Sequence, residues 1–141
     1  MFLGVHSHTL DDKGRVMIPS RFREELGERF IITRGLDHCL FVFPTPEWQK
    51  LAEKISLLPF TKADARAFTR ILFSGAHECE LDKQGRALIP PVLREYARLV
   101  KNVEIIGVQG RVEIWSSEEW RHYVESSAAS YEELAEKLGI S

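Results

Sequence analysis

The sequence has little of what disulfide-bonded, membrane-bound or secreted proteins require. It contains only two cysteines in 141 residues, Cys39 and Cys79, which are too few for a disulfide framework. No apolar run approaches the ~20 residues that span a membrane. Residues 1–6 lack the basic flank and the long apolar core of a secretory signal. We therefore expect a cytoplasmic protein that makes no membrane contact.

Motifs of the common enzyme classes are also missing. The sequence contains no Gly-x-Ser-x-Gly nucleophile motif, no phosphate-binding loop and no His-Glu-x-x-His zinc motif. No pair of carboxylates is singled out by its spacing. These absences lead us to expect a protein without enzymatic activity, without a cofactor and without a small-molecule substrate.

Charge is distributed unevenly along the chain. The formal net charge is -2, but residues 118–141 carry six acidic and two basic side chains, a net charge of -4. Residues 1–117 therefore carry 17 basic and 15 acidic side chains, a net charge of +2. This mildly basic part of the chain permits an anionic partner such as nucleic acid without requiring one.

The most informative feature of the sequence is an internal repeat. Residues 10–24 recur as residues 81–95, with identical side chains at eight of the fifteen aligned positions. A match of this density at one fixed offset indicates an internal duplication. We predict two half-domains, residues 1–60 and residues 73–141, joined by a connecting helix over residues 61–72. The second half-domain includes an additional C-terminal helix.

Each repeat is predicted to begin as a strand, a turn, a second strand and a short helix. In the first repeat these elements are expected at residues 2–10, 11–14, 15–18 and 20–28, followed by a hairpin of residues 30–33 and 40–43. Asp11 suits the start of the turn because its carboxylate can accept backbone N–H groups, and Gly14 suits its end because glycine tolerates positive φ. We expect the two strands beside this turn to pair with each other as a hairpin.

The repeated turn combines an aspartate with an arginine four residues later. Asp11 with Arg15, and Asp82 with Arg86, could simply brace each turn through a surface ion pair worth ~0–1 kcal/mol. However, turn geometry needs only Asp and Gly, and the arginine is present in both copies. A guanidinium held on a rigid turn is well suited to bidentate contact with a phosphate or with a guanine base.

The two Asp-x-x-x-Arg turns, each followed by Ile-Pro and a short helix, resemble the MraZ family of bacterial transcriptional regulators over nearly the whole chain. The resemblance implies an α+β fold, a double-split β-barrel of the AbrB/SpoVT swapped-hairpin type, built from two tandem pseudo-repeats with flanking helices. It also implies a ring-shaped homo-oligomer that binds double-stranded DNA at direct repeats in the promoter of the division and cell-wall gene cluster. Such a protein would be cytoplasmic and nucleoid-associated.

The resemblance also implies which residues face the DNA. The motif residues and their neighbours in the two turns are Asp11, Lys13, Gly14, Arg15, Asp82, Lys83, Gly85 and Arg86. Because the lysine moves by one place between the copies, we expect unequal contacts, with Arg15 contributing more to base contact than Arg86. Arg21 and Arg23, at the start of the first short helix, could neutralise phosphates or lie on a solvated face.

Two other classes of function are compatible with the sequence. His6 with His8, and His77 with Cys79, are spaced two apart on expected strands and could form a metal-binding sensor or enzyme site, although a partly buried histidine in a strand is commoner. Alternatively, the helices that contain Trp48 and Trp120 could be docking surfaces of a structural module. Aromatic residues at helical spacing more often pack a core.

Overall fold

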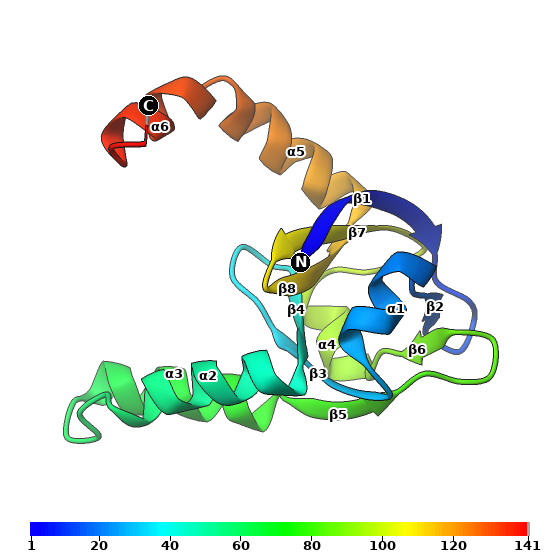
Figure 1. The fold of residues 1–141 in the computed structure, drawn as a ribbon, viewed down its shortest axis with the longest axis horizontal. Helices are drawn as coiled ribbons and strands as arrows, with labels where there is room; N and C mark the ends of the chain where they lie inside the picture. Colours follow the sequence, from blue (N-terminus) through cyan, green and yellow to red (C-terminus); the bar gives the residue numbers. More distant parts are fainter. Residues whose placement is uncertain (141) are drawn as a thin grey trace.

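Strand pairing across the two repeats determines this α+β fold, which a computed structural model describes for residues 1–140 (Figure 1). The elements are β1 (Phe2–Thr9), β2 (Arg15–Met17), α1 (Ser20–Leu26), β3 (Arg29–Arg34), β4 (Leu40–Pro44), α2 (Thr45–Ser56), α3 (Ala63–Ser74), β5 (His77–Glu80), β6 (Arg86–Leu88), α4 (Pro91–Tyr96), β7 (Asn102–Gln109), β8 (Arg111–Ser116), α5 (Ser117–Ala128) and α6 (Tyr131–Lys137). Six strands form one sheet in the order β1-β7-β8-β4-β3-β5, and β2 pairs with β6 in a separate ribbon.

The prediction that residues 2–10 and residues 15–18 pair with each other as a hairpin is wrong. The turn between them forms, but β1 pairs antiparallel with β7 and β2 pairs antiparallel with β6, so both strands find their partners in the second repeat. The physical reason is that β1 can pair along all eight of its residues with β7, whereas β2 has only three residues. The other expected hairpin, β3 with β4, is confirmed.

The pairing relates the two repeats by an approximate two-fold axis. β1 with β7 corresponds to β5 with β3, while β2 with β6 and β4 with β8 are self-related pairs. Val16 lies opposite Ala87 at the centre of the ribbon, and both side chains are buried in the core. The repeats therefore share one core. Its largest fully buried side chains come from both, including Phe30, Ile32, Leu40, Ile89, Leu93 and Ile105.

Helices α2 and α3, and helices α5 and α6, form two arms that leave the body on its two sides. In Figure 1 the arms extend to the left at the bottom and top of the view, whereas the turns that precede β2 and β6 lie at the right. Aromatic contacts join each arm to the sheet: Trp48 packs against Phe43, and Trp120 packs against Trp115.

Within residues 1–140, no helix combines the length and the apolar character needed to cross a membrane.

Candidate nucleic-acid interface

The first repeated turn is closed by its backbone and by the side chain of Asp11. The Gly14 N–H donates to the Asp11 carbonyl (3.0 Å), and the Asp11 N–H donates to the Arg15 carbonyl (2.9 Å). Asp11 Oδ1 also accepts the N–H groups of Lys13 (2.9 Å) and Arg15 (2.8 Å). Gly14 has a φ of +82°, which confirms the predicted role of glycine in the turn.

The same aspartate holds the arginine side chain. Arg15 Nε donates to Asp11 Oδ2 (2.6 Å), and about one third of each side chain is exposed. The backbone N–H of Arg15 is the largest of several hydrogen-bond and charge effects that lower the pKa of Asp11 to about 2. Asp11 is therefore ionised at physiological pH. It engages only the Nε edge of the guanidinium, so the two terminal nitrogens of Arg15 have no hydrogen bond to residues 1–140.

The second turn repeats this arrangement. Asp82 Oδ1 accepts the N–H groups of Gln84 and Arg86 (both 2.9 Å), and Asp82 Oδ2 accepts a hydrogen bond from Arg86 Nε (2.8 Å). Gly85 has a φ of +81°. The hydrogen bond from the Arg86 backbone is again the largest of the effects that lower the aspartate pKa. In both turns, therefore, the aspartate and the turn backbone hold the arginine side chain in a fixed position.

Pairing of β2 with β6 brings the two motifs to one surface. Arg15 lies opposite Leu88, and Met17 lies opposite Arg86, so these four side chains share the outer face of the ribbon while Val16 and Ala87 fill the core behind it. Arg86 Nη1 also lies 3.6 Å from Asp11 Oδ2, in the other repeat. Local sequence patterns do not predict this convergence, because it depends on a strand pairing between residues 69 to 73 positions apart.

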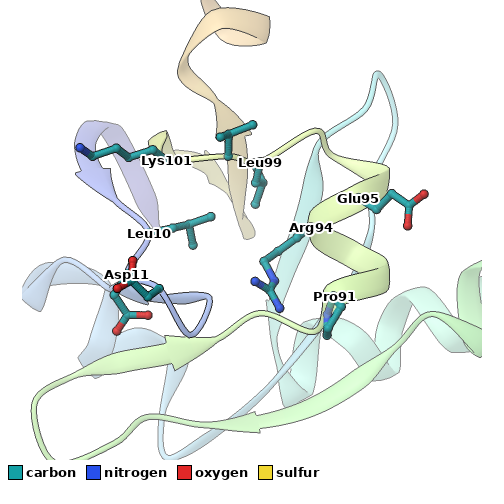
Figure 2. A pocket seen from close by; sticks show the side chains of 9 residues that line it. Leu10, Asp11, Pro91, Arg94, Glu95, Leu99 and Lys101 are labelled. Atoms are coloured by element: carbon teal, nitrogen blue, oxygen red, sulfur yellow. The ribbon is translucent and has the colours of Figure 1, made fainter.

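Each short helix supports the turn of the other repeat. The guanidinium of Arg23, on α1, lies over Gly85, where an added Cβ would be 2.5 Å from Arg23 Nη1. The guanidinium of Arg94, on α4, lies over Gly14, where an added Cβ would be 2.6 Å from Arg94 Cζ. Figure 2 shows the Arg94 side chain extending from α4 toward the segment that carries Asp11. Two arginines at equivalent positions of the repeats thus each pack against the glycine of the opposite turn.

The two supporting arginines differ in their hydrogen bonding. Arg23 Nε donates to the Ile18 carbonyl (2.8 Å), which anchors the side chain. Arg94 Nε is buried and has no hydrogen-bond partner within residues 1–140. The repeat relationship of Arg23 and Arg94 was visible in the sequence, but their contacts with the opposite turns were not.

The remaining cationic candidates are exposed. Lys13 and Lys83 lie at the turn tips, and Arg21 lies on the outer side of α1. Asp12 is exposed beside Lys13, so the first tip carries both signs of charge. Arg15 and Arg86 are thus held close together by aspartate carboxylates, whereas the other cationic candidates extend into solvent.

The two candidate metal-binding pairs, His6 with His8 on β1 and His77 with Cys79 on β5, lie on different strands. His6 lies on β1 and His77 on β5, the two edge strands of the six-stranded sheet. His6 packs edge-on against Phe22, and His77 Nδ1 lies 2.9 Å from the Gly75 carbonyl oxygen. Burial raises the pKa of the Cys79 thiol to about 11. Within residues 1–140 there is no group of three His, Cys, Asp or Glu side chains that could hold a metal ion.

Comparison with known proteins gives matches over nearly the whole chain. A family model described as "MraZ protein, putative antitoxin-like" matches residues 1–71 and again residues 72–139. A protein of Carboxydothermus hydrogenoformans named transcriptional regulator MraZ is 64% identical over 138 residues, which cover 98% of this chain and 96% of that protein. Proteins of the same name from Pelotomaculum thermopropionicum and Heliobacterium modesticaldum are 62% and 61% identical, over 98% of this chain and 95% and 96% of theirs.

Proposed function

The chain belongs to the MraZ family, and from this membership we propose that it is a sequence-specific DNA-binding transcriptional regulator. It acts as a ring-shaped homo-oligomer on direct repeats in the promoter of the division and cell-wall gene cluster, and it works in the cytoplasm at the nucleoid. The observation that carries the proposal is the convergence of Arg15 and Arg86 on one outer face of the β2–β6 ribbon.

The chemistry of this face supports contact with DNA. A guanidinium whose Nε edge is held by a carboxylate can present its terminal nitrogens to a phosphate or to the O6 and N7 atoms of guanine without first losing much side-chain freedom. Lys13 and Lys83 at the flanking tips supply further contacts with phosphates. Fixed arginines between exposed lysines provide both base contact and positioning on the backbone.

The two arginines are proposed to have different roles. Arg15 has one carboxylate partner and two terminal nitrogens free of hydrogen bonds to residues 1–140, which suits base contact. The Arg86 guanidinium contacts the carboxylates of both Asp82 and Asp11, so less of it is available to DNA. We assign Arg15 to base contact and Arg86 to structure or backbone contact.

We further propose that the fold is the double-split β-barrel of AbrB and SpoVT, with half-domains at residues 1–60 and 73–141 and the connecting helix at residues 61–72. The exchange of strands between the repeats supports this assignment, because β1 and β2 each pair with a strand of the other half. On this assignment the turns are parts of a single unit that requires both halves.

Oligomer formation would compensate for the low net charge of the chain. A subunit that neutralises only a few phosphates binds DNA non-specifically with a Kd of about 10⁻⁴ to 10⁻⁶ M at physiological salt. Linked subunits on tandem repeats can increase the overall affinity by ~10²–10⁴ without new types of contact. Direct repeats in the DNA therefore match a protein that assembles from identical subunits.

The test is binding of the protein to its own upstream DNA at several salt concentrations. We compare the wild type with Arg15→Ala, Arg86→Ala and the control Arg29→Ala, which removes an exposed arginine on β3 whose ion partners, Glu78 and Glu80, lie on β5 outside the two turns. Arg15→Ala is expected to weaken specific binding ~10–100-fold, as for loss of a bidentate base contact, and the control to leave it unchanged. If neither turn variant differs from the control, the proposed site is wrong.

A further inference from the structure

A hollow of about 540 Å³ lies between α4 and the end of β1, beside the first repeated turn (Figure 2). Its walls combine apolar side chains, among them Leu10 and Leu99, with charged side chains, among them Asp12, Arg94 and Lys101. Sites for small molecules typically measure ~300–1,000 Å³ and join apolar walls to a few polar groups. The hollow therefore has the size and the lining of a site for a small polar ligand.

The guanidinium of Arg94 lines this hollow without a partner. Its Nε is buried, and within residues 1–140 the side chain forms no hydrogen bond or ion pair. Figure 2 shows the neighbouring Glu95 side chain directed away from it. A buried charged donor without an acceptor is costly, and the other partly buried arginines of the described chain all donate to a carboxylate or a carbonyl: Arg15, Arg23, Arg34, Arg86 and Arg111. Arg94 therefore lacks an acceptor that arginines elsewhere in this fold possess.

The internal repeat supplies a matched comparison, because an equivalent hollow of about 580 Å³ lies beside the second turn. Two arginines, Arg23 and Arg29, line it. Arg23 corresponds to Arg94 at an offset of 71 residues. Arg29 corresponds to Lys101 at an offset of 72 residues. Each turn is thus accompanied by a hollow with two cations at matched positions.

The two hollows differ in how their cations are neutralised. Beside the second turn, the arginine on β3 pairs with Glu78 and Glu80 of β5. The positions that correspond to these glutamates in the first repeat are occupied by Ser7 and Thr9, which carry no charge. Lys101 is exposed and has no ion pair within residues 1–140. The hollow beside the first turn therefore keeps both cations but lacks the carboxylates that neutralise one of them in the other hollow.

We propose that the hollow beside the first turn binds a small organic molecule through an anionic group, either a phosphate or a carboxylate. Arg94 holds this group, because the fork of a guanidinium matches two oxygens of a phosphate or a carboxylate, and Lys101 adds a second cation at the rim. The ligand also carries hydroxyl or ammonium donors, because the Asp12 carboxylate at the rim would repel a purely anionic molecule.

A DNA strand matches this hollow less well than a small ligand does. The strand would bring a row of phosphates to a rim that carries the exposed carboxylates of Asp12 and Glu95. A small molecule can place one anionic group beside Arg94 and donors beside Asp12. The site goes beyond the proposed function and does not depend on it, because ligand binding is measured on the protein without DNA.

The experiment is isothermal titration calorimetry of the full-length protein at constant ionic strength. The two probes are glycerol 3-phosphate and lactate, which carry hydroxyl groups beside a phosphate or a carboxylate. We expect at least one probe to bind at one site per chain with a Kd of about 1 mM or tighter, and the tighter probe identifies the anionic group. If neither probe binds at concentrations up to ~10 mM, the proposal is wrong.

Substitutions at the two cations locate the binding. Arg94→Met should weaken binding ~10-fold or more, because it removes a charged hydrogen-bond donor. Lys101→Met should weaken it ~2–5-fold, as for an exposed ion pair. The matched control is Arg29→Met, at the equivalent position of the other hollow, which should leave binding unchanged. Binding that is equal in the wild type and in Arg94→Met and Lys101→Met would overturn the proposal.

Two further measurements keep the result unambiguous. Arg94 also packs against Gly14, so circular dichroism checks the fold of Arg94→Met; if the fold is lost, Lys101→Met and its control decide. The salt dependence of DNA binding tests the other source of phosphate. If neither probe binds but Arg94→Met lowers the slope of log K against log salt concentration by about 0.9, Arg94 contacts a DNA phosphate and the small-molecule site is wrong.

Discussion

The guanidinium of Arg23 lies against Gly85, so a helix of the first repeat holds the turn of the second in place. The reciprocal contact joins Arg94 to Gly14. Because each repeat supports the other's turn, the geometry of the two Asp-x-x-x-Arg motifs depends on the whole domain rather than on either half alone.

Alanine at the turn glycines should therefore have unequal effects. Gly14 and Gly85 have nearly the same φ, so the backbone strain of Gly14→Ala and Gly85→Ala is similar. Displacing Arg23 breaks its hydrogen bond to the Ile18 carbonyl, whereas Arg94 Nε has no bond to lose. We expect Gly85→Ala to reduce the free energy of unfolding by ~1 kcal/mol more than Gly14→Ala, measured by urea denaturation. In an Arg23→Met background this excess should disappear, and its persistence would rule out the contact as the cause.

Stability should depend on the ionisation of Asp11 at acid pH. The folded-state pKa of Asp11, about 2, lies below the ordinary value of 3.8. The contribution of Asp11 is therefore fully present above pH 4 and is lost as the pH falls from about 4 to about 2. Asp11→Asn should flatten the pH dependence of the urea midpoint in this range. A wild-type and an Asp11→Asn curve that stay parallel down to pH 2 would show that the carboxylate is not held as described.

The two aspartates should differ in their effect on DNA binding. Asp11 contacts the guanidinium of Arg15 and lies 3.6 Å from that of Arg86, whereas Asp82 contacts only the guanidinium of Arg86. Asp11→Ala frees both guanidiniums from a carboxylate, so we expect a larger loss of specific affinity than for Asp82→Ala. Fluorescence anisotropy with the upstream DNA measures the dissociation constant of each variant. Equal losses would mean that the contact between the repeats does not order the arginines.

Lysines at the turn tips should contribute affinity without sequence preference. Lys13→Ala and Lys83→Ala should each lower the slope of log K against log salt concentration by about 0.9 if the lysine neutralises one phosphate. The ratio of specific to non-specific affinity should change little. Lys54→Ala, on helix α2, which extends away from the turns (Figure 1), is the control. If a lysine variant has the same slope as the control variant, that lysine does not contact DNA.

Several features of the site were predictable because they depend on neighbouring residues. The Asp11 carboxylate caps N–H groups two and four residues ahead, and Gly14 adopts positive φ within the same turn. The hairpin of β3 and β4 is likewise short-range. The expected pairing of residues 2–10 with residues 15–18 failed because turn chemistry determines how the chain reverses and does not determine which strands remain paired beyond it.

The sequence by itself determined the duplication, the two turns with their arginines, the acidic character of residues 118–141 and the family to which the chain belongs. The tertiary structure alone decided that β1 pairs with β7 and β2 with β6, and hence that Arg15 and Arg86 share one face while Arg23 supports Gly85. The reason is that β2 and β6 have the same alternation of buried and outward side chains, which is compatible with several partners. The eight-residue pairing of β1 with β7 and the burial of Val16 and Ala87 in one common core select the pairing between the repeats.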